Sequence, residues 1–262
     1  MSKKIFIVAE IGNNHEGNFQ LAKKLIYEAY RCGVDAVKFQ VFKTDLFIHN
    51  QDEKTYKKFK KFELSQKKFL LLKRYSEKLG LTFFGSAFDN ESLDFLIRNT
   101  NIIKVASSEN VNLEMINKIL KNGKKCIIST GFLNTNLIKK LINNLNKSFS
   151  KNFLRKKLSL MHCISSYPVN NKDLNLNVIK QLKKNFNLNI GYSDHSLGSD
   201  ACKIAVSLGA KIIEKHFTLD KNFSNFRDHK LSADPKEMRE IVNYMKDIEL
   251  ILGNGKKKNH RK

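Results

Sequence analysis

Short apolar runs alternate with amphipathic segments along most of this chain. Residues 5–9 form a continuous apolar run, which is typical of a strand buried on both faces. The next segment, 18–32, begins with the capping residue Asn18 and carries apolar side chains at helical spacing. Gly33 follows it at the position where a helix is expected to end. One strand followed by one helix is therefore the expected local unit.

The same unit recurs along the chain. The expected strands are residues 5–9, 36–40, 82–85, 102–105, 125–129, 158–163, 188–192 and 211–214. The expected helices are residues 18–32, 65–79, 91–98, 113–121, 135–146, 174–185, 199–208 and 235–252. Residues 43–62 hold no clear core pattern and many lysines, so that they predict an excursion or a long loop above the sheet.

Eight strands that alternate with eight helices predict right-handed parallel crossovers. At 262 residues, the parsimonious closure is a single-domain α/β protein with a (β/α)₈ (TIM) barrel over residues 1–255, followed by a basic tail at 256–262. The rival is an open doubly wound sheet with a glycine-rich first turn. Residues 12–17 lack the G-x-G-x-x-G spacing of that turn, which favours the barrel.

Composition changes this prediction little. The formal net charge is +23, but the lysines are scattered among asparagines and isoleucines, as an AT-rich coding bias would also produce. With no zinc-finger or RNA-binding motif beside them, we expect no nucleic-acid partner. The longest apolar runs fall short of a membrane span, and no cleavable leader follows Met1, so that we expect a cytoplasmic protein without membrane contact. The four cysteines lack C-x-x-C spacing and are expected to be reduced.

Polar side chains follow or end all eight expected strands, where a barrel places its active site. Two of them are histidines, His195 and His216, at matching ends of neighbouring strands. Two imidazoles with open positions suit a divalent first-row metal, with Mn²⁺ as first choice and Zn²⁺ or Mg²⁺ as alternatives. Lys38 and Lys104 lie inside apolar strands and predict an anion clamp. The alternatives for either residue are a lysine paired with a carboxylate and a Schiff-base lysine.

Seven segments in this order resemble the sialic acid synthase family. They are AEIGNNHEG at 9–17, VKFQ at 37–40, IKVASSE at 103–109, STG at 129–131, HCISSYP at 162–168, GYSDHS at 191–196 and IEKHFT at 213–218. These enzymes are C–C bond-forming transferases that condense phosphoenolpyruvate with an N-acetylated hexose to give a nonulosonic acid. The resemblance spans the barrel and implies homodimers and a divalent metal, most often manganese.

The resemblance also implies residue roles. The metal ligands would be His195 and His216, and Glu10 would act near the reacting centre, positioning a water molecule or handling its proton. The residues implied to hold phosphoenolpyruvate are Lys38, Ser86, Lys104, Ser107, Ser129, Ser165 and Ser193. Those implied to contact the sugar are Gln40, Glu109, Tyr167 and Asp228.

Two departures fall on the sugar side. Family members typically continue into a small antifreeze-like domain, whereas this sequence stops at the basic tail, and we expect a barrel without that lid. The loop before Asp228 reads Ser-Asn-Phe-Arg in place of a Gly-Pro turn. The acceptor stays open among N-acetylmannosamine, a diacetamido sugar and a 6-phosphorylated sugar. Another phosphoenolpyruvate-dependent 3-deoxy-sugar-acid synthase and a non-catalytic sugar-binding barrel are the alternative functions.

Overall fold

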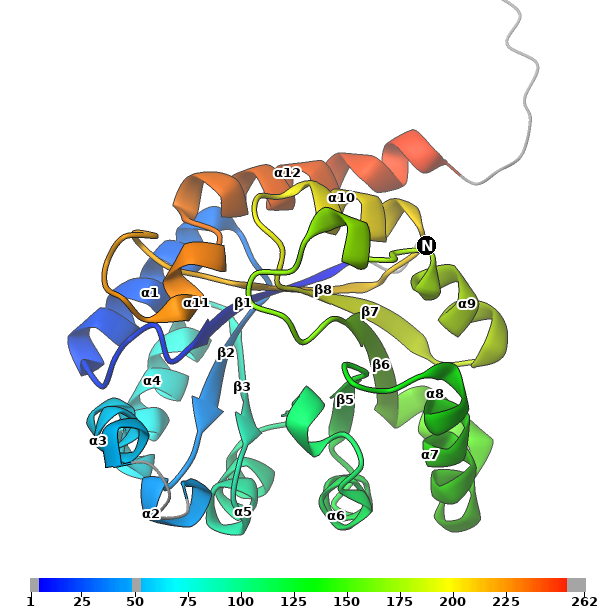
Figure 1. Ribbon diagram of the computed structural model, residues 1–262, viewed down its shortest axis with the longest axis horizontal. Coiled ribbons are helices and arrows are strands. Elements are labelled where there is room, and N and C mark those ends of the chain that lie inside the picture. The colour runs from blue at the N-terminus through cyan, green and yellow to red at the C-terminus, as the bar shows by residue number, and fades with distance from the viewer. Residues whose placement is uncertain (1–4, 49–52, 254–262) are drawn as a thin grey trace, which may run out of the picture.

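The computed structural model describes residues 5–48 and 53–253 and contains a closed barrel of eight parallel strands (Figure 1). Each strand pairs with its neighbours in chain order, and β8 closes the ring by pairing with β1. The strands are β1 (Phe6–Gly12), β2 (Ala36–Val41), β3 (Thr82–Ala87), β4 (Ile102–Val105), β5 (Lys125–Ser129), β6 (Leu158–Cys163), β7 (Asn189–Asp194) and β8 (Ile212–His216). The predicted (β/α)₈ barrel is confirmed.

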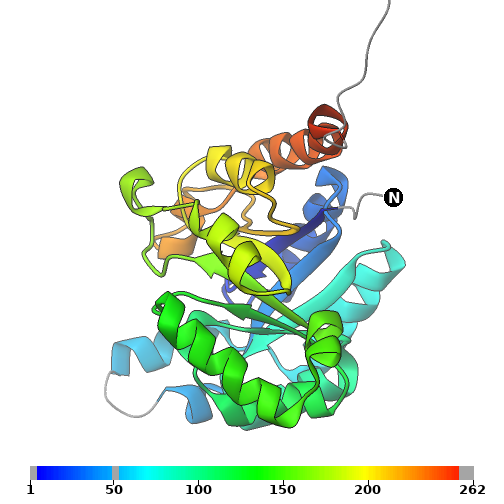
Figure 2. The same cartoon turned by 90° about the vertical axis from the view of Figure 1, so that its right-hand side faces the viewer.

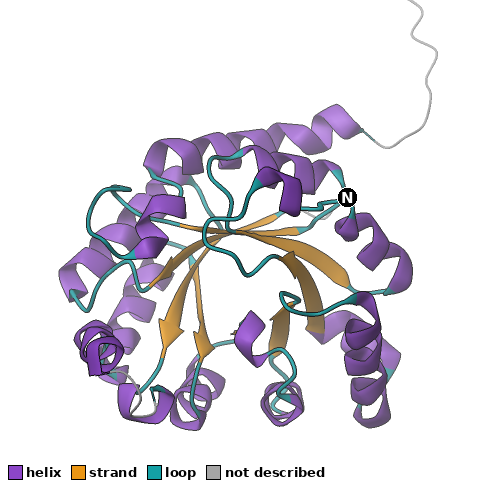
Figure 3. Ribbon diagram, in the orientation of Figure 1, coloured by secondary structure: helices purple, strands orange, loops and turns teal. Residues whose placement is uncertain are grey.

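Helices surround the ring of strands (Figure 3). The main ones are α1 (Phe19–Cys32), α4 (Gln66–Lys78), α5 (Asn90–Asn99), α6 (Leu113–Lys121), α7 (Thr135–Ser148), α9 (Val178–Asn185), α10 (Asp200–Ser207) and α12 (Pro235–Leu252). Shorter elements are α2 (Thr44–Phe47), α3 (Glu53–Phe62), α8 (Lys151–Lys157), α11 (Arg227–Leu231) and the 3₁₀ turns η1 (Ser107–Glu109) and η2 (Asn171–Asp173). Asn18 caps α1 as expected, because its side chain accepts bonds from the Gln20 and Leu21 amides.

Three local predictions were wrong. Residues 43–62 are an excursion but not a long loop, because α2 forms before residues 49–52 and α3 forms after them. Helix α8 was not expected, and its seven residues give only two turns of pattern. The helix expected from residue 174 begins at Val178, after the turn η2. The predicted basic tail, 256–262, lies outside the described residues.

Residues 43–62 contribute to a phenylalanine cluster, although most of their side chains are polar and many are lysines. Phe62 packs edge-to-face on Phe226, with ring centroids 5.2 Å apart, and so joins α3 to the segment that enters α11. The aromatic cluster consists of Phe42, Phe47, Phe59, Phe62, Phe88 and Phe226. Figure 2 shows α2, α3 and α11 toward the same side of the barrel. Aromatic side chains in edge-to-face and tilted contact thus form one wall above the strand ends.

Layers of inward side chains fill the barrel. Side chains alternate along a strand, so that residues two apart share a direction. One layer is apolar and consists of Val8, Ala36, Phe84, Ile127, Met161 and Ile212. Two residues further along the strands toward their C-terminal ends, the inward positions become ionic, as at Glu10 after Val8 and Glu214 after Ile212. The apolar layer therefore forms a floor beneath a charged one.

Candidate active site

Five polar side chains form a buried network directly above the apolar floor, and we call it the ionic layer. Its members are Glu10, Lys38, Lys104, Ser193 and Glu214, each at most 5% exposed. They come from β1, β2, β4, β7 and β8. The strand register places Glu10 beside both Lys38 and His216, so that hydrogen bonding between strands fixes the layer.

Two lysines and two glutamates of the ionic layer neutralise each other. Lys38 Nζ lies 2.9 Å from Glu10 Oε1 and 3.7 Å from Glu214 Oε1. Lys104 Nζ lies 2.8 Å from the same Glu214 oxygen, to which Ser193 Oγ donates at 3.0 Å. Ser86 Oγ accepts from Lys38 Nζ at 3.3 Å. Buried charges are stable only when paired in this way.

The two carboxyl groups titrate far apart. Burial raises the pKa of Glu10 to about 7, because Lys38 opposes it only in part and Glu214 adds to the rise. Burial acts on Glu214 as well, but Lys104 and Lys38 outweigh it and lower the pKa of Glu214 to about 2. Near neutral pH, Glu214 is therefore the fixed counter-ion, whereas Glu10 can exchange a proton. Carboxyl pairs separated in this way often divide catalytic roles.

The two predicted histidine ligands lie together at the end of β7 and β8. Their ring centroids are 5.5 Å apart, and the Tyr167 ring lies 4.2 Å from that of His195. His195 Nδ1 donates to the Ile164 carbonyl at 2.8 Å, which leaves Nε2 for a ligand. His216 Nδ1 is buried with no hydrogen-bond partner among the described residues. Burial, with His195 and Lys38 nearby, holds the pKa of His216 well below its ordinary value.

A second buried ion pair supports both histidines from the outer side of the barrel. Lys215 Nζ lies 2.8 Å from Asp194 Oδ2 and also donates to the Ser196 carbonyl. Asp194 directly precedes His195, and Lys215 directly precedes His216. The pair therefore ties the end of β7 to the end of β8 beside the two histidines. Burial would raise the pKa of Asp194, but Lys215 holds it below its usual range.

The loop after β5 brings two predicted serines together. A Cβ added at Gly131 would lie 2.3 Å from Ser165 Oγ and 2.6 Å from Ser107 Oγ, so that only glycine lets both hydroxyls approach this backbone. Asn110 Nδ2 holds the loop by donating to the carbonyls of Ser129 and Gly131 at 3.1 and 2.6 Å. The Ser165 hydroxyl is buried without a partner among the described residues. An anionic ligand would satisfy such donors.

A hollow of about 260 Å³ opens beside His216. Three predicted sugar contacts, Gln40, Tyr167 and Asp228, line it. Asn13 Nδ2 donates to Gln40 Oε1 at 2.7 Å and orients that amide. The Asp228 carboxylate is buried, and burial raises its pKa although Arg227 opposes the shift. The remaining lining residues are Lys58, Phe59, Phe226 and Arg227, which come from α3 and the segment around the start of α11.

One predicted sugar contact lies apart from the others. Glu109 does not line this hollow, and its carboxylate accepts a bond from Asn112 at 3.2 Å.

Several residues of the site were not predicted from the sequence. Glu214 was not assigned a role, although its position two residues before His216 indicates that its side chain points inward. Asn13 and Asn110 lie in turns, and Lys58 and Arg227 lie in the short helices α3 and α11, so that strand periodicity gives no signal for any of the four.

Comparisons with known proteins agree along nearly the whole chain. Residues 25–257 match the model of the NeuB family. An uncharacterized protein of Methanocaldococcus jannaschii is 44% identical over 96% of this chain and 73% of its own length. The N,N'-diacetyllegionaminic acid synthase of Legionella pneumophila is 39% identical over 98% of this chain and 76% of its own. The crystal structure of N-acetylneuraminic acid synthetase from Leptospira borgpetersenii, in complex with citrate, superposes with a TM-score of 0.90, at 35% identity over 98% of this chain and 88% of that one.

Proposed function

The chain belongs to the NeuB family of sialic and nonulosonic acid synthases, and we propose that it condenses phosphoenolpyruvate with an N-acetylated hexose and releases phosphate. One observation carries the proposal. The strand register pairs Glu10 with both Lys38 and His216. The buried cations of the ionic layer, Lys38 and Lys104, therefore lie close to the hollow that His216 lines with the polar groups of Gln40 and Asp228. Phosphoenolpyruvate, a small trianion, would bind at a lower level beside the two lysines. The sugar would bind at an upper level beside the polar groups of the hollow.

Phosphoenolpyruvate would occupy the lower level. Its carboxylate and phosphate would take over the positive charge that Glu10 and Glu214 now neutralise on Lys38 and Lys104. The hydroxyls of Ser86, Ser107, Ser129, Ser165 and Ser193 would add donors. Protonation of Glu10 leaves the ionic layer with a net positive charge, which favours the anion. The lysines then stabilise the charge that develops on the leaving phosphate.

The reaction would form a carbon–carbon bond and a carbon–oxygen bond and break the carbon–oxygen bond to phosphate. Carbon 3 of phosphoenolpyruvate attacks the aldehyde carbon of the open-chain sugar, and water adds to the cation at carbon 2. Phosphate then leaves from carbon 2, which becomes a keto group. Of the two protons of the water molecule, one balances the proton that the aldehyde oxygen takes up to become a hydroxyl group, and the other leaves with the phosphate. Glu10 Oε2 is buried without a hydrogen-bond partner among the described residues and would accept the proton of the attacking water.

The upper level would select the acceptor. Gln40, Tyr167 and Asp228 offer an amide, a phenol and a carboxylate to hydroxyl and N-acetyl groups. A diacetamido hexose is supported by the similarity to the Legionella enzyme, and N-acetylmannosamine is the alternative within this class. Glu109 would reach such an acceptor only from outside the hollow.

The histidine pair fits a divalent cation, with Mn²⁺ as our first choice. His216 is held neutral and has an orphaned buried nitrogen, while His195 is oriented by the Ile164 carbonyl. In the described part of the chain, no three His, Cys, Asp or Glu side chains are arranged to hold a metal ion by themselves, so that oxygen atoms of substrate or water would complete the shell. When bound, such an ion supplies a Lewis acid for the aldehyde oxygen.

Metal binding should depend on the inward histidines and not on other buried histidines. We expect His216→Ala to weaken Mn²⁺ binding by about tenfold or more, measured by equilibrium dialysis with electron paramagnetic resonance detection. His162→Ala is the matched control, because His162 is also buried on a neighbouring strand but bonds the Leu174 carbonyl at 2.7 Å. Equal Mn²⁺ affinity in the two variants would contradict the assignment.

Phosphate release tests the proposed activity. Wild-type protein with Mn²⁺ and phosphoenolpyruvate should release phosphate only when an N-acetylated hexose is present, with a diacetamido hexose or N-acetylmannosamine in the panel. Aldose phosphates without an N-acetyl group serve as the comparison, because turnover with these alone would identify another 3-deoxy-sugar-acid synthase. No release with any acceptor would leave a non-catalytic sugar-binding barrel.

A further inference from the structure

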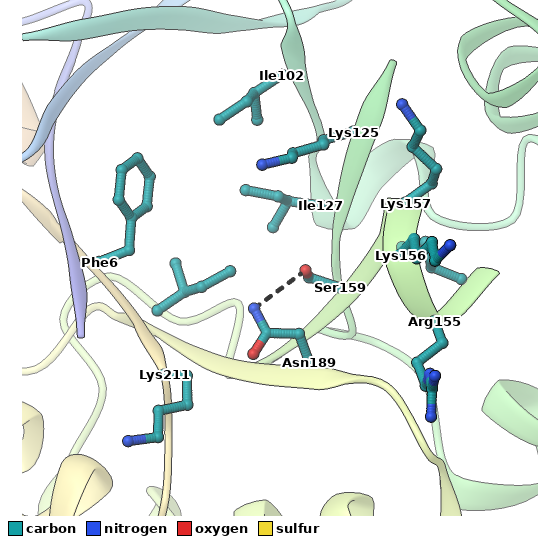
Figure 4. Close-up of a pocket in the computed structure, with 12 residues that line it drawn as sticks. Phe6, Ile102, Lys125, Ile127, Arg155, Lys156, Lys157, Ser159, Asn189 and Lys211 are labelled. Atoms are coloured by element: carbon teal, nitrogen blue, oxygen red, sulfur yellow. Dashed lines mark hydrogen bonds between the residues drawn. The ribbon is translucent and has the colours of Figure 1, made fainter. Parts of the chain in front are cut away.

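A second hollow lies at the opposite end of the barrel, where the strands begin. Its volume is about 300 Å³, and we call it the basic hollow. Figure 4 shows Arg155, Lys156 and Lys157 on one edge, Phe6 and Lys211 on the opposite edge, and Lys125 between them. The lining set is completed by Ile102, Ile127, Leu158, Ser159, Asn189 and Ile212. Nothing in the proposed reaction uses this end of the molecule.

The basic hollow has five cationic side chains and no acidic one in its lining. Lys125, Arg155 and Lys156 are exposed, and none has an ion-pair partner among the described residues. Lys157 Nζ donates to the Gly123 carbonyl, which holds its side chain beside the opening. Lysine and arginine make up 48 of 262 residues, or fewer than one in five, whereas here they make up five of twelve. General basicity therefore does not account for this concentration.

Helix stability explains only part of the set. Arg155, Lys156 and Lys157 lie in the last turn of α8, where cations interact favourably with the helix dipole. Lys125 begins β5, and Lys211 directly precedes β8, so that neither can serve that purpose. Three separate segments thus contribute cationic side chains to the lining of one hollow. Mutual repulsion between the exposed cations Lys125, Arg155 and Lys156 costs stability unless an anion is bound.

The base of the hollow has a different character from its rim. Phe6 and Ile102 are half-buried and pack on the apolar layer, of which Ile127 and Ile212 are members. Beside this surface, Asn189 Nδ2 donates to Ser159 Oγ at 3.4 Å, and the Asn189 amide oxygen is a further acceptor. The hollow therefore offers an apolar surface, one amide–hydroxyl pair and a cationic rim.

We propose that the basic hollow binds a phosphorylated nucleoside. The base would lie on Phe6, Ile102 and Ile127, Asn189 and Ser159 would bond its polar edge, and the phosphates would lie between Lys125 and Lys156. A free phosphate would use only the rim, and an uncharged nucleoside only the base of the hollow. The volume suits one mononucleotide, whereas an extended nucleic acid would need a groove.

Calorimetric titration with ADP at low ionic strength tests this site on the full chain. We expect one ADP per chain, and saturating phosphoenolpyruvate should not displace it, because the two ligands occupy opposite ends of the barrel. Arg155→Glu/Lys156→Glu should weaken ADP by about tenfold or more, since it reverses two rim charges. Lys67→Glu/Lys68→Glu changes net charge equally on exposed α4 and should leave ADP affinity within about twofold.

Titrations with adenosine and with pyrophosphate test the contributions of the base of the hollow and of its rim separately. Adenosine and pyrophosphate should each bind more weakly than ADP, and Asn189→Leu should weaken ADP but not pyrophosphate. Pyrophosphate binding as tight as ADP would overturn the nucleotide assignment. So would equal losses in the two charge-reversal variants, or displacement of ADP by phosphoenolpyruvate. Tighter binding of a single-stranded RNA, lost in the same rim variant, would replace it with a nucleic-acid surface.

Discussion

Replacing Glu10 with glutamine should slow phosphate release by about a thousandfold, because the amide cannot accept the proton of the attacking water. Phosphoenolpyruvate binding should change little, since glutamine keeps an oxygen for Lys38 and resembles the protonated acid. In the wild type, kcat/KM should rise with pH through about 7, the pKa to which burial raises Glu10. That rise should be absent from the residual activity of the variant.

Glu10 should also make the stability of the wild type depend on pH, and the free energy of unfolding should fall over the same range in which kcat/KM rises. The folded protein holds the Glu10 proton up to about pH 7, whereas the unfolded chain releases it near pH 4.5. The wild type should therefore lose about 3 kcal/mol of unfolding free energy relative to Glu10→Gln as pH rises through this interval, with no further loss above it. Glu214 titrates in both proteins, so that its effect largely cancels in the difference.

Urea unfolding of both proteins across this pH range measures the difference. Glu77→Gln is a suitable control, because Glu77 is half exposed and pairs with Lys73 on the surface. A Glu10→Gln protein with wild-type kcat would sink the proton-transfer role. A stability difference that is constant from pH 4.5 to 7 would show instead that Glu10 is ionised throughout.

Replacing Lys215 with methionine should destabilise the fold by about 3–5 kcal/mol, because it leaves the Asp194 carboxylate buried beside β7 without its cation. For a domain of this size, the melting temperature should fall by about 10 °C. The loss should also reach the metal site, since the ion pair aligns His195 and His216. We therefore expect weaker Mn²⁺ binding even at temperatures where the variant is folded.

A double-mutant cycle measures the interaction energy between Lys215 and Asp194. Adding Asp194→Asn to Lys215→Met removes the uncompensated charge and should recover part of the lost free energy. Lys73→Met breaks an exposed pair and should cost at most about 1 kcal/mol. If Lys215→Met costs no more than this control, the buried pair does not stabilise the barrel.

The strand and helix alternation was sufficient to predict the barrel, because parallel strands buried on both faces are continuous apolar runs. It was insufficient at residues 43–62. There the buried phenylalanines are spaced among lysines, and their partners, Phe88 and Phe226, lie in distant loops. Short helices such as α8 give too few turns for periodicity to appear. Tertiary packing, rather than local pattern, decides such segments.

The candidate site was also predictable from the sequence only in part. Strand ends identified which residues approach the pocket, and alternation of side chains separates inward Glu214 and His216 from outward Lys215. No local pattern states that Lys104 meets Glu214 across 110 positions, because barrel closure creates that contact. The roles assigned to these residues stay predictions until they are tested by substitution.

The aromatic cluster has a consequence for how the proposed acceptor specificity could evolve. It holds one side of the hollow, with Lys58 and Arg227, on α3 and the segment entering α11, whereas the ionic layer is fixed by strand pairing. Gln40, on β2, belongs to the strand framework and would stay in place. Substitutions in these two helical segments would therefore reshape one side of the hollow while the ionic layer is inherited unchanged.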